Sequence, residues 1–311
     1  MGLRVAITGA NGYTGRFVAE RLVAEGHAIV NLTNHPDRPA DAPVAGTGPL
    51  AFEDPAALAR GLAGVDVLVN TYWVRYPRGE VTFERAVENI GRLATAAARA
   101  GVRRIVHVSI AKAGESELPY YRGKLAGEAA VRASGVPAAI VRPTILFGES
   151  DVLMNNIAWA MRHLPVFGVP GDGSYPIQPI HVRDHAELIA SLVTSDDTGT
   201  HDSQGPERYT FTELLRMVRW AIGSHTLIVR MPPPLAQLGA WGIGLLQRDV
   251  MMTPDELRGL MDGLLSTDAS PAGHTSLAQW LRAERATIGK RYASELDRHF
   301  RQAKGPGVAG A

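Results

Sequence analysis

A tyrosine and a lysine stand four residues apart in the segment PYYRGKLAGE, as Tyr120 and Lys124. On a helix, residues with this spacing share one face. A lysine ammonium beside a phenol favours the phenolate and lowers the phenol pKa from about 10 by roughly 1–3 pH units. Such a tyrosine can pass a proton to or from a substrate oxygen. The spacing therefore predicts an acid–base pair. Tyr121 is the second candidate for the acid, and a structural role for the pair is the alternative.

Three glycines, Gly9, Gly12 and Gly15, follow a short apolar run in ITGANGYTGRF. A glycine-rich turn between a first strand and a first helix lets the pyrophosphate of a dinucleotide approach the backbone at the positive end of the helix. The spacing here is G-x-x-G-x-x-G rather than G-x-G-x-x-G. The context predicts a bound dinucleotide, and a glycine turn without a ligand is the alternative.

The end of the second predicted strand, in NLTNHPDR, bears on the choice of cofactor. An acidic residue there favours NAD, whereas a basic group accommodates the extra phosphate of NADP. This chain has Asn34 and His35 at the strand end and Arg38 nearby, and the carboxylate of Asp37 lies beyond the strand end itself. NADP(H) is therefore favoured and NAD(H) stays possible. The alternative for His35 and Arg38 is that they are ordinary solvated loop residues.

Strands alternating with helices must position these groups. The apolar patterns predict strands at 3–8, 28–33, 65–70, 104–109 and 138–142, and helices at 13–25, 54–60, 82–100, 120–134 and 183–192. Such alternation implies right-handed βαβ units. We predict an α/β fold with a Rossmann-type doubly wound parallel sheet.

The regular alternation of strands and helices ends after Pro143. A helix is predicted at 151–164, then a Pro- and Gly-rich loop (PVFGVPGDGSYPIQPI), a capped helix in TPDELRGLMDGLL and a long amphipathic helix at 275–301. We expect a dinucleotide-binding domain at 1–150 with 178–200. A smaller, mainly helical substrate lobe is expected at 151–177 with 201–303, and a disordered tail at 304–311.

The amino-acid composition limits the classes of function that this protein can have. The 311 residues carry a formal net charge of +1 and 6% aromatic residues, which argues against a nucleic-acid partner. Cysteine is absent, so disulfides and thiol nucleophiles are excluded, and no HExxH or similar ligand spacing predicts a metal. The apolar stretch 235–246 is too short for a transmembrane segment, which needs about 20 residues. It is either buried or in contact with a partner or membrane surface. We expect a cytoplasmic monomer or homodimer.

Several aromatic and amide side chains are candidates for a substrate pocket. Trp73 follows a predicted buried strand, and a second group comes from the later part of the chain: Asn155, Asn156, Tyr175 and Gln178. Aromatic walls with a few amides suit a small carbonyl or hydroxyl compound. The alternative for each of them is packing between the two lobes.

Taken in order, the glycine loop, VENIGRLATAAARAGVRRIVHVS, the Tyr120/Lys124 pair, RPTILFG and IHVRDHAEL resemble the short-chain dehydrogenase/reductase superfamily. The similarity is to its extended and atypical branches, the NAD-dependent epimerase/dehydratase type. Within them it is nearest to relatives of the nucleotide-binding accessory subunit of respiratory complex I, through YYRGKLAGE, VPGDGSYPIQPIHV and RDVMMTPDELRGLMDGLL.

This resemblance implies roles for further residues. It places Asn11 and Tyr13 in the pyrophosphate loop and an apolar residue, Phe52, beside the adenine. Residues expected near the nicotinamide and its ribose are Asn70, Thr71, Tyr72, Lys124, Pro143 and Thr144. The family commonly has a substrate-orienting hydroxyl after the HVS strand. Here Ser109 is present, but Ile110 occupies the next position, where the acting hydroxyl often lies.

The sequence thus predicts an NAD(P)-dependent oxidoreductase acting on a small carbonyl or hydroxyl substrate. Tyr120 and Lys124 would provide acid–base chemistry and Ser109 a substrate hydrogen bond. Two alternatives stay open. One is a sugar-type epimerase or dehydratase with tightly bound NAD. The other is a catalytically silent nucleotide-binding sensor or accessory protein.

Overall fold

The computed structural model describes residues 2–35 and 42–294. The chain divides into two compact units, and each is described by itself. The first comprises 1–149, 176–209 and 262–277. The second comprises 150–175, 210–261 and 278–311.

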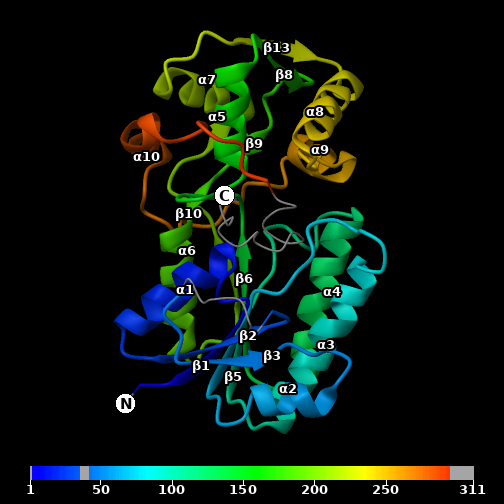
Figure 1. The fold of residues 1–311 in the computed structure, drawn as a ribbon, viewed down its shortest axis with the longest axis vertical. Coiled ribbons are helices and arrows are strands. Elements are labelled where there is room, and N and C mark those ends of the chain that lie inside the picture. The colour runs from blue at the N-terminus through cyan, green and yellow to red at the C-terminus, as the bar shows by residue number, and fades with distance from the viewer. Residues whose placement is uncertain (1, 36–41, 295–311) are drawn as a thin grey trace, which may run out of the picture. The chain divides into compact units, whose positions relative to one another are not determined.

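A seven-stranded parallel sheet forms the centre of the first unit (Figure 1). Its strand order is β11-β6-β5-β4-β1-β2-β3. The strands are β1 (Arg4–Thr8), β2 (Ala28–Thr33), β3 (Gly46–Pro49), β4 (Val67–Asn70), β5 (Arg104–Val108), β6 (Ala138–Pro143) and β11 (Thr200–Ser203). The order reverses between β1 and β4, which is the switch point where doubly wound sheets bind ligands. The predicted Rossmann-type fold is confirmed.

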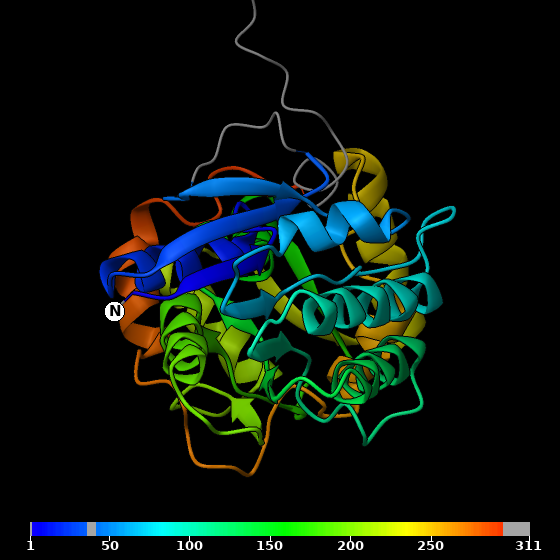
Figure 2. The same ribbon diagram turned by 90° about the horizontal axis from the view of Figure 1, so that it is seen from below.

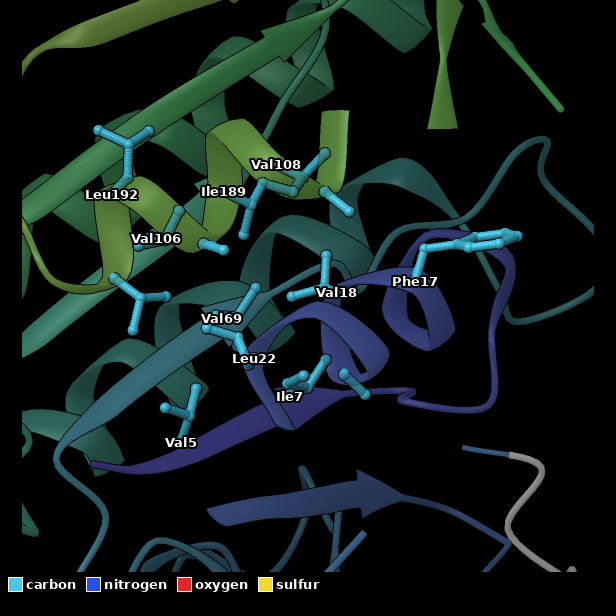
Figure 3. Packing of buried hydrophobic residues seen from close by; sticks show 14 of the residues in the cluster. Val5, Ile7, Phe17, Val18, Leu22, Val69, Val106, Val108, Ile189 and Leu192 are labelled. Carbon is cyan, nitrogen blue, oxygen red and sulfur yellow. The ribbon is translucent and has the colours of Figure 1, made fainter. Parts of the chain in front are cut away.

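Helices cover both faces of this sheet, as the view from below shows (Figure 2). One face carries α1 (Tyr13–Ala24) and α6 (Val182–Val193), and the other carries α2 (Pro55–Gly61), α3 (Phe83–Arg99) and α4 (Pro119–Ala133). Successive side chains of a strand point to opposite faces. Val5 and Ile7 of β1 accordingly pack with Leu22 of α1 in one core (Figure 3), whereas Ala6 joins the other.

Local signals set most of these bounds. Asp54 caps α2 by accepting hydrogen bonds from the amides of Ala56 and Ala57, and Thr82 caps α3. Strand β2 has the predicted bounds. The short β3 was not predicted, because its sequence GTGP carries no strand pattern and its pairing with β2 is tertiary. The unit also contains the two-residue strands β7 (Leu146–Phe147), β9 (Pro176–Ile177) and β10 (Ile180–His181).

The second unit is mainly helical. It contains α5 (Leu153–His163), α7 (Phe211–Ala221), α8 (Pro233–Gln247), α9 (Pro254–Met261), α10 (Leu277–Ala283) and a short 3₁₀ turn (Glu284–Ala286). Strands β8 (Val166–Pro170) and β13 (Leu227–Met231) pair in parallel. Strand β12 (Tyr209–Thr210) lies where the chain passes from one unit to the other.

The structure differs from the sequence-based expectation at three places. The loop predicted at 165–180 forms β8, β9 and the first residue of β10. Residues 201–209 and 262–277 belong to the first unit, in part because β11 pairs with β6. The long helix predicted at 275–301 is wrong in its described part. Helix α10 ends at Ala283, and Gly289 has a φ of +71° and lies so close to the backbone of Ala158 that no Cβ would fit. The remainder of that helix and the tail at 304–311 lie outside the described residues.

Candidate active site

The loop between β1 and α1 is held by the neighbouring strand β2. The amide of Gly9 donates to Leu32 O at 2.8 Å, and the amide of Ala10 donates to the buried Asn31 Oδ1 at 2.8 Å. Within the loop, the Gly12 amide donates to Gly9 O at 2.7 Å. Gly9 has a φ of +69°, a backbone conformation that favours glycine. Asn31 had no predicted role, since a single amide in an apolar strand gives no signal of what it will hold.

The geometry of this loop fits the pyrophosphate of a dinucleotide. A Cβ on Gly15 would lie 2.2 Å from Gly9 O, and one on Gly12 would lie 3.0 Å from the same atom. The glycines therefore permit a backbone turn that side chains would block. Helix α1 begins at Tyr13 with no capping bond from a described side chain and no acidic residue in its first turn. Its amide end carries partial positive charge, which suits a phosphate. Asn11 and Tyr13 belong to this same loop and helix start.

The end of β4 is a hydrogen-bonded junction with β1 and β5. Asn70 accepts from Thr8 Oγ1 at 3.1 Å and donates to His107 Nδ1 at 3.0 Å, and Thr71 Oγ1 donates to Thr8 O at 2.6 Å. Burial, together with a smaller effect of the nearby Lys124 charge, lowers the pKa of His107 to about 3, so this imidazole is neutral. Asn70 and Thr71 were predicted to contact cofactor, but here both side chains bind protein groups.

Tyr72 follows directly. Its hydroxyl accepts from Asn89 Nδ2 at 3.0 Å, and its ring lies 4.7 Å from the ring of Phe52, centroid to centroid. Burial raises the Tyr72 pKa, against a smaller opposite effect of Asn89. Phe52 is buried. Phe52 follows β3 and Tyr72 follows β4, so this ring contact joins the two chain segments that leave these strands.

Lys124 is a buried cation on α4. Its Nζ donates to Val108 O at 3.2 Å and lies 4.7 Å from the centre of the Trp73 ring. Burial lowers the Lys124 pKa to about 7, and the charge of Glu128 partly opposes this shift. A lysine with a pKa near neutrality in a sheet-edge site is a candidate for function on physical grounds.

Tyr120 and Lys124 meet around Trp73. The Tyr120 ring is edge-on to the Trp73 ring at 5.8 Å and to the Phe83 ring at 5.7 Å. Tyr120 is half-buried, whereas Tyr121 is buried in an apolar cluster with Leu118 and Leu264. Tyr120 also packs against this cluster, but it is the more accessible of the two phenols. Ile110 packs against the same cluster.

Ser109 forms part of a buried charged network. Its hydroxyl donates to Glu128 Oε1 at 2.5 Å, and Arg142 binds both carboxylate oxygens of Glu128 at 2.9 and 2.7 Å. The single Ser109 proton is thus directed at Glu128 in this arrangement. The predicted substrate hydrogen bond from Ser109 has no donor here. Glu128 was not predicted as part of the site, because its contacts with Ser109 and Arg142 are between segments distant in sequence.

The other predicted cofactor positions lie at strand ends. Asn34 and His35 are exposed beyond β2, and Arg38 lies outside the described residues. Pro143 ends β6, and Thr144 Oγ1 donates to Gln178 O at 2.5 Å. The buried Thr144 side chain thus connects the end of β6 to the segment between β9 and β10.

Most of the predicted substrate residues pair with protein backbone. In the second unit, Asn155 binds Arg291 O and the Gly289 amide, and Asn156 binds both backbone groups of Ala293. Tyr175 donates to Pro170 O and stacks on Phe211. In the first unit, Gln178 donates to Gly205 O at 2.9 Å. These contacts support packing for the four residues, and Trp73 alone of the predicted set borders Tyr120 and Lys124.

Two further features are absent from residues 2–35 and 42–294. No group of three or more His, Cys, Asp or Glu side chains is arranged to hold a metal ion there. No described helix is both long and apolar enough to cross a bilayer.

The doubly wound sheet, the glycine loop at its switch point and the buried lysine define an NAD(P)-dependent oxidoreductase of Rossmann type. Residues 9–156 match the sequence profile of a family described as NAD(P)H-binding. The chain is 32% identical over 238 residues to ceramide reductase of Caulobacter vibrioides, covering 74% of each chain. It is 31% identical to the (4-alkanoyl-5-oxo-2,5-dihydrofuran-3-yl)methyl phosphate reductase of Streptomyces griseus, covering 75% of this chain and 83% of that one.

A more distant relative is the mitochondrial 40 kDa subunit of NADH-ubiquinone oxidoreductase from Neurospora crassa, 27% identical over 86% of this chain and 73% of that one. The same fold occurs in an NADPH-dependent quinone oxidoreductase from Escherichia coli, with a TM-score of 0.73, 22% identity and coverage of 90% and 99%. The chain belongs to a family of NAD(P)H-binding reductases, and it also has relatives among the subunits of mitochondrial NADH-ubiquinone oxidoreductase.

Proposed function

We propose that this enzyme reduces the carbonyl group of a small-molecule substrate, or oxidises the matching hydroxyl, with NADP(H) as its preferred cofactor. Tyr120 is the proton donor or acceptor at the reacting oxygen. The observation that carries this proposal is the buried Lys124 ammonium, which shares the Trp73 ring with the Tyr120 phenol. The two relatives above 30% identity are both named as reductases, which supports the reaction class.

In this proposal, different residues of the chain bind the cofactor, support proton transfer and exclude water. The amides at the start of α1 and the loop from Gly9 to Gly15 hold the pyrophosphate. When bound, NAD(P)H would supply the hydride for reduction, and NAD(P)⁺ would accept it for oxidation. Lys124 in its charged form stabilises the Tyr120 phenolate and so eases proton transfer at the substrate oxygen. The Trp73 and Phe83 rings limit the access of water to this phenol and strengthen the electrostatic effect of the lysine.

The test is the Tyr120→Phe variant of the full chain, assayed over a panel of carbonyl compounds with NADPH. We expect unchanged NADPH binding by calorimetry and a loss of turnover of about 10²–10⁴-fold, the range for a positioned acid or base. Tyr121→Phe is the matched control, and it should retain turnover. Full activity in Tyr120→Phe would refute the mechanism.

One observation favours a second function, that of a catalytically silent nucleotide-binding protein. The Ser109 proton is directed at Glu128, and Ile110 supplies no hydroxyl at the next position. A substrate oxygen near Tyr120 would then lack a second hydrogen-bond donor. Thermal stabilisation by NADPH without turnover of any carbonyl in the panel would support this function over the first.

A further inference from the structure

A cavity of about 270 Å³ lies within the second unit, between α8, α9 and the β8–β13 pair. Among its described lining residues, Gln237 is the only one with a polar side chain. Small residues of α8, namely Ala236, Gly239 and Ala240, form one wall. The volume is close to the lower end of the range for small-molecule pockets, about 300–1,000 Å³.

Three methionines, Met231, Met251 and Met252, contribute to the lining. Methionine side chains are unbranched and flexible, and they adapt to apolar ligands of varying shape. Gly239 is an exposed member of this wall, and a Cβ built on it meets no atom within 4 Å, so a larger side chain has room at this position. The lining is therefore suited to a flexible apolar group rather than to a rigid polar one.

The side-chain amide of Gln237 makes a hydrogen bond through its nitrogen, whereas its oxygen has no described partner. Its Nε2 donates to Met252 O at 3.0 Å, which fixes the orientation of the amide. Its Oε1 is buried, and no described donor reaches it. A buried acceptor without a partner costs about 1–3 kcal/mol. A ligand that brings an N–H or O–H group to this oxygen would remove that cost.

The outer face of α8 is also apolar. Leu238 and Leu246, which line neither of the two cavities described in this subsection, are 59% and 73% exposed, and α8 contains no charged residue. A partner surface laid on this face would cover these side chains. It would leave the cavity and the Gln237 acceptor beneath the helix unchanged. The unpartnered oxygen thus identifies the inner cavity, rather than the outer face, as the ligand site.

We propose that this cavity binds the alkyl chain of a single-chain amphiphile, with an N–H or O–H group at the chain's polar end donating to Gln237 Oε1. A second cavity of about 330 Å³ shares Gln237, Ala240, Met251 and Met252 with the first, and its remaining lining includes the apolar Trp241 and Leu245 beside the charged Arg248 and Asp249. It receives the polar head of the ligand. This binding does not require the carbonyl chemistry proposed above.

The test uses N-methylalkanamides of increasing chain length, titrated into the full-length protein by calorimetry. Each buried methylene contributes about 0.8 kcal/mol, so affinity should rise about fourfold per carbon until the cavity is full. Methyl dodecanoate, which lacks the N–H, should bind several-fold more weakly than N-methyldodecanamide. Gln237→Met should abolish this preference for the amide. Absence of binding, or equal binding of amide and ester by the unmodified protein, would overturn the proposal.

A matched pair of variants separates the cavity from the outer face. Gly239→Leu places a side chain in the cavity and should weaken binding of the amide at least tenfold. Gly242→Leu makes the same change at an open helix position that lines neither cavity, and it should bind as the unmodified protein does. If Leu238→Ser reduces binding and Gly239→Leu does not, the outer face is the site and the cavity proposal fails. NADPH binding, measured in each variant, should stay unchanged whatever the fate of the proposed reaction.

Discussion

The Nζ of Lys124 lies 4.7 Å from the centre of the Trp73 ring while it donates to Val108 O. This ammonium is held by a ring face and one carbonyl in a site from which water is largely excluded. Burial is the main reason that its pKa falls to about 7. A group that titrates in this range will make the enzyme sensitive to pH near neutrality.

The first prediction concerns the pH dependence of turnover. If charged Lys124 is the form that supports Tyr120, kcat/KM should be highest below pH 7 and fall as the pH rises through about 7, since the lysine then loses its proton. Lys124→Arg keeps the charge at all these values and should move the falling limb upward by more than one pH unit. A profile that is flat from pH 6 to 9 in the unmodified enzyme would contradict the assignment.

The second prediction concerns stability. The folded-state pKa of Lys124 is about 7 and its ordinary value is 10.5, so between these values the unfolded chain holds a proton that the folded chain has released. Stability should therefore increase with pH across this window, and the full penalty applies below pH 7. Lys124→Met removes this cost of burying the charge, which is about 1.4 kcal/mol per pKa unit. The substitution also removes the contacts with the Trp73 ring and Val108 O, and their loss offsets part of the gain in stability.

The measurement is urea unfolding at pH 6 and pH 9. The gain from Lys124→Met should be a few kcal/mol at pH 6 and smaller at pH 9, while turnover is lost. An equal effect at both pH values would show that the lysine does not titrate in this way.

The third prediction separates a structural from a catalytic Ser109. Because its proton is directed at Glu128, Ser109→Ala should reduce stability by about 1–3 kcal/mol and change kcat by only a few-fold. Chemical unfolding and steady-state kinetics on the same preparation would test both parts. A loss of turnover above a hundredfold in a well-folded Ser109→Ala protein would mean that the hydroxyl turns to the substrate.

The fourth prediction concerns the cofactor loop. In Gly15→Ala the new Cβ would lie 2.2 Å from Gly9 O, so the loop must move and NADPH affinity should fall by at least tenfold in calorimetry. Gly91→Ala in α3 is the control, because its Cβ would be 3.8 Å from the nearest atom. That variant should bind NADPH normally and be more stable by about 0.5–1 kcal/mol. Equal NADPH affinities in the two variants would argue against the loop as the pyrophosphate site.

The fifth prediction tests cofactor preference. Arg38→Ala should weaken NADPH binding several-fold and leave NADH binding unchanged, because only NADPH carries the additional phosphate. The ratio of the two dissociation constants is the readout. His35→Ala, at the exposed end of β2, shows whether the imidazole shares this role. An unaltered ratio in both variants would leave the segment after β2 without a part in selection.

The sequence was sufficient for features that depend on local pattern. The strands β1, β2, β4, β5 and β6 are apolar runs, and the capping residues Asp54 and Thr82 mark helix starts directly. The glycine loop was predictable because its three glycines stand between the first strand and the first helix. Tyr120 and Lys124 lie on one helix, and their spacing alone brought them together.

Features that depend on distant residues were not predictable. Nothing near Ser109 indicates that its proton goes to Glu128, since their contact requires β5 and α4 to pack. Asn70 and Thr71 occupy expected positions, but their side chains are used by Thr8 and His107. The long helix predicted from 275 fails because the backbone of Gly289 packs against Ala158, a contact between segments far apart in sequence.

Asn31 and Leu32 of β2 accept hydrogen bonds from the first two amides of the glycine loop, and the exposed Asn34 and His35 follow the end of the same strand. The loop that we propose as the pyrophosphate site is thus held by groups of a buried strand, whereas Asn34 and His35 are exposed. We therefore expect that substitutions at these two positions can alter cofactor preference without disturbing the loop. A change of preference between NADP(H) and NAD(H) is therefore best sought by varying the residues from Asn34 onward while Asn31 is kept.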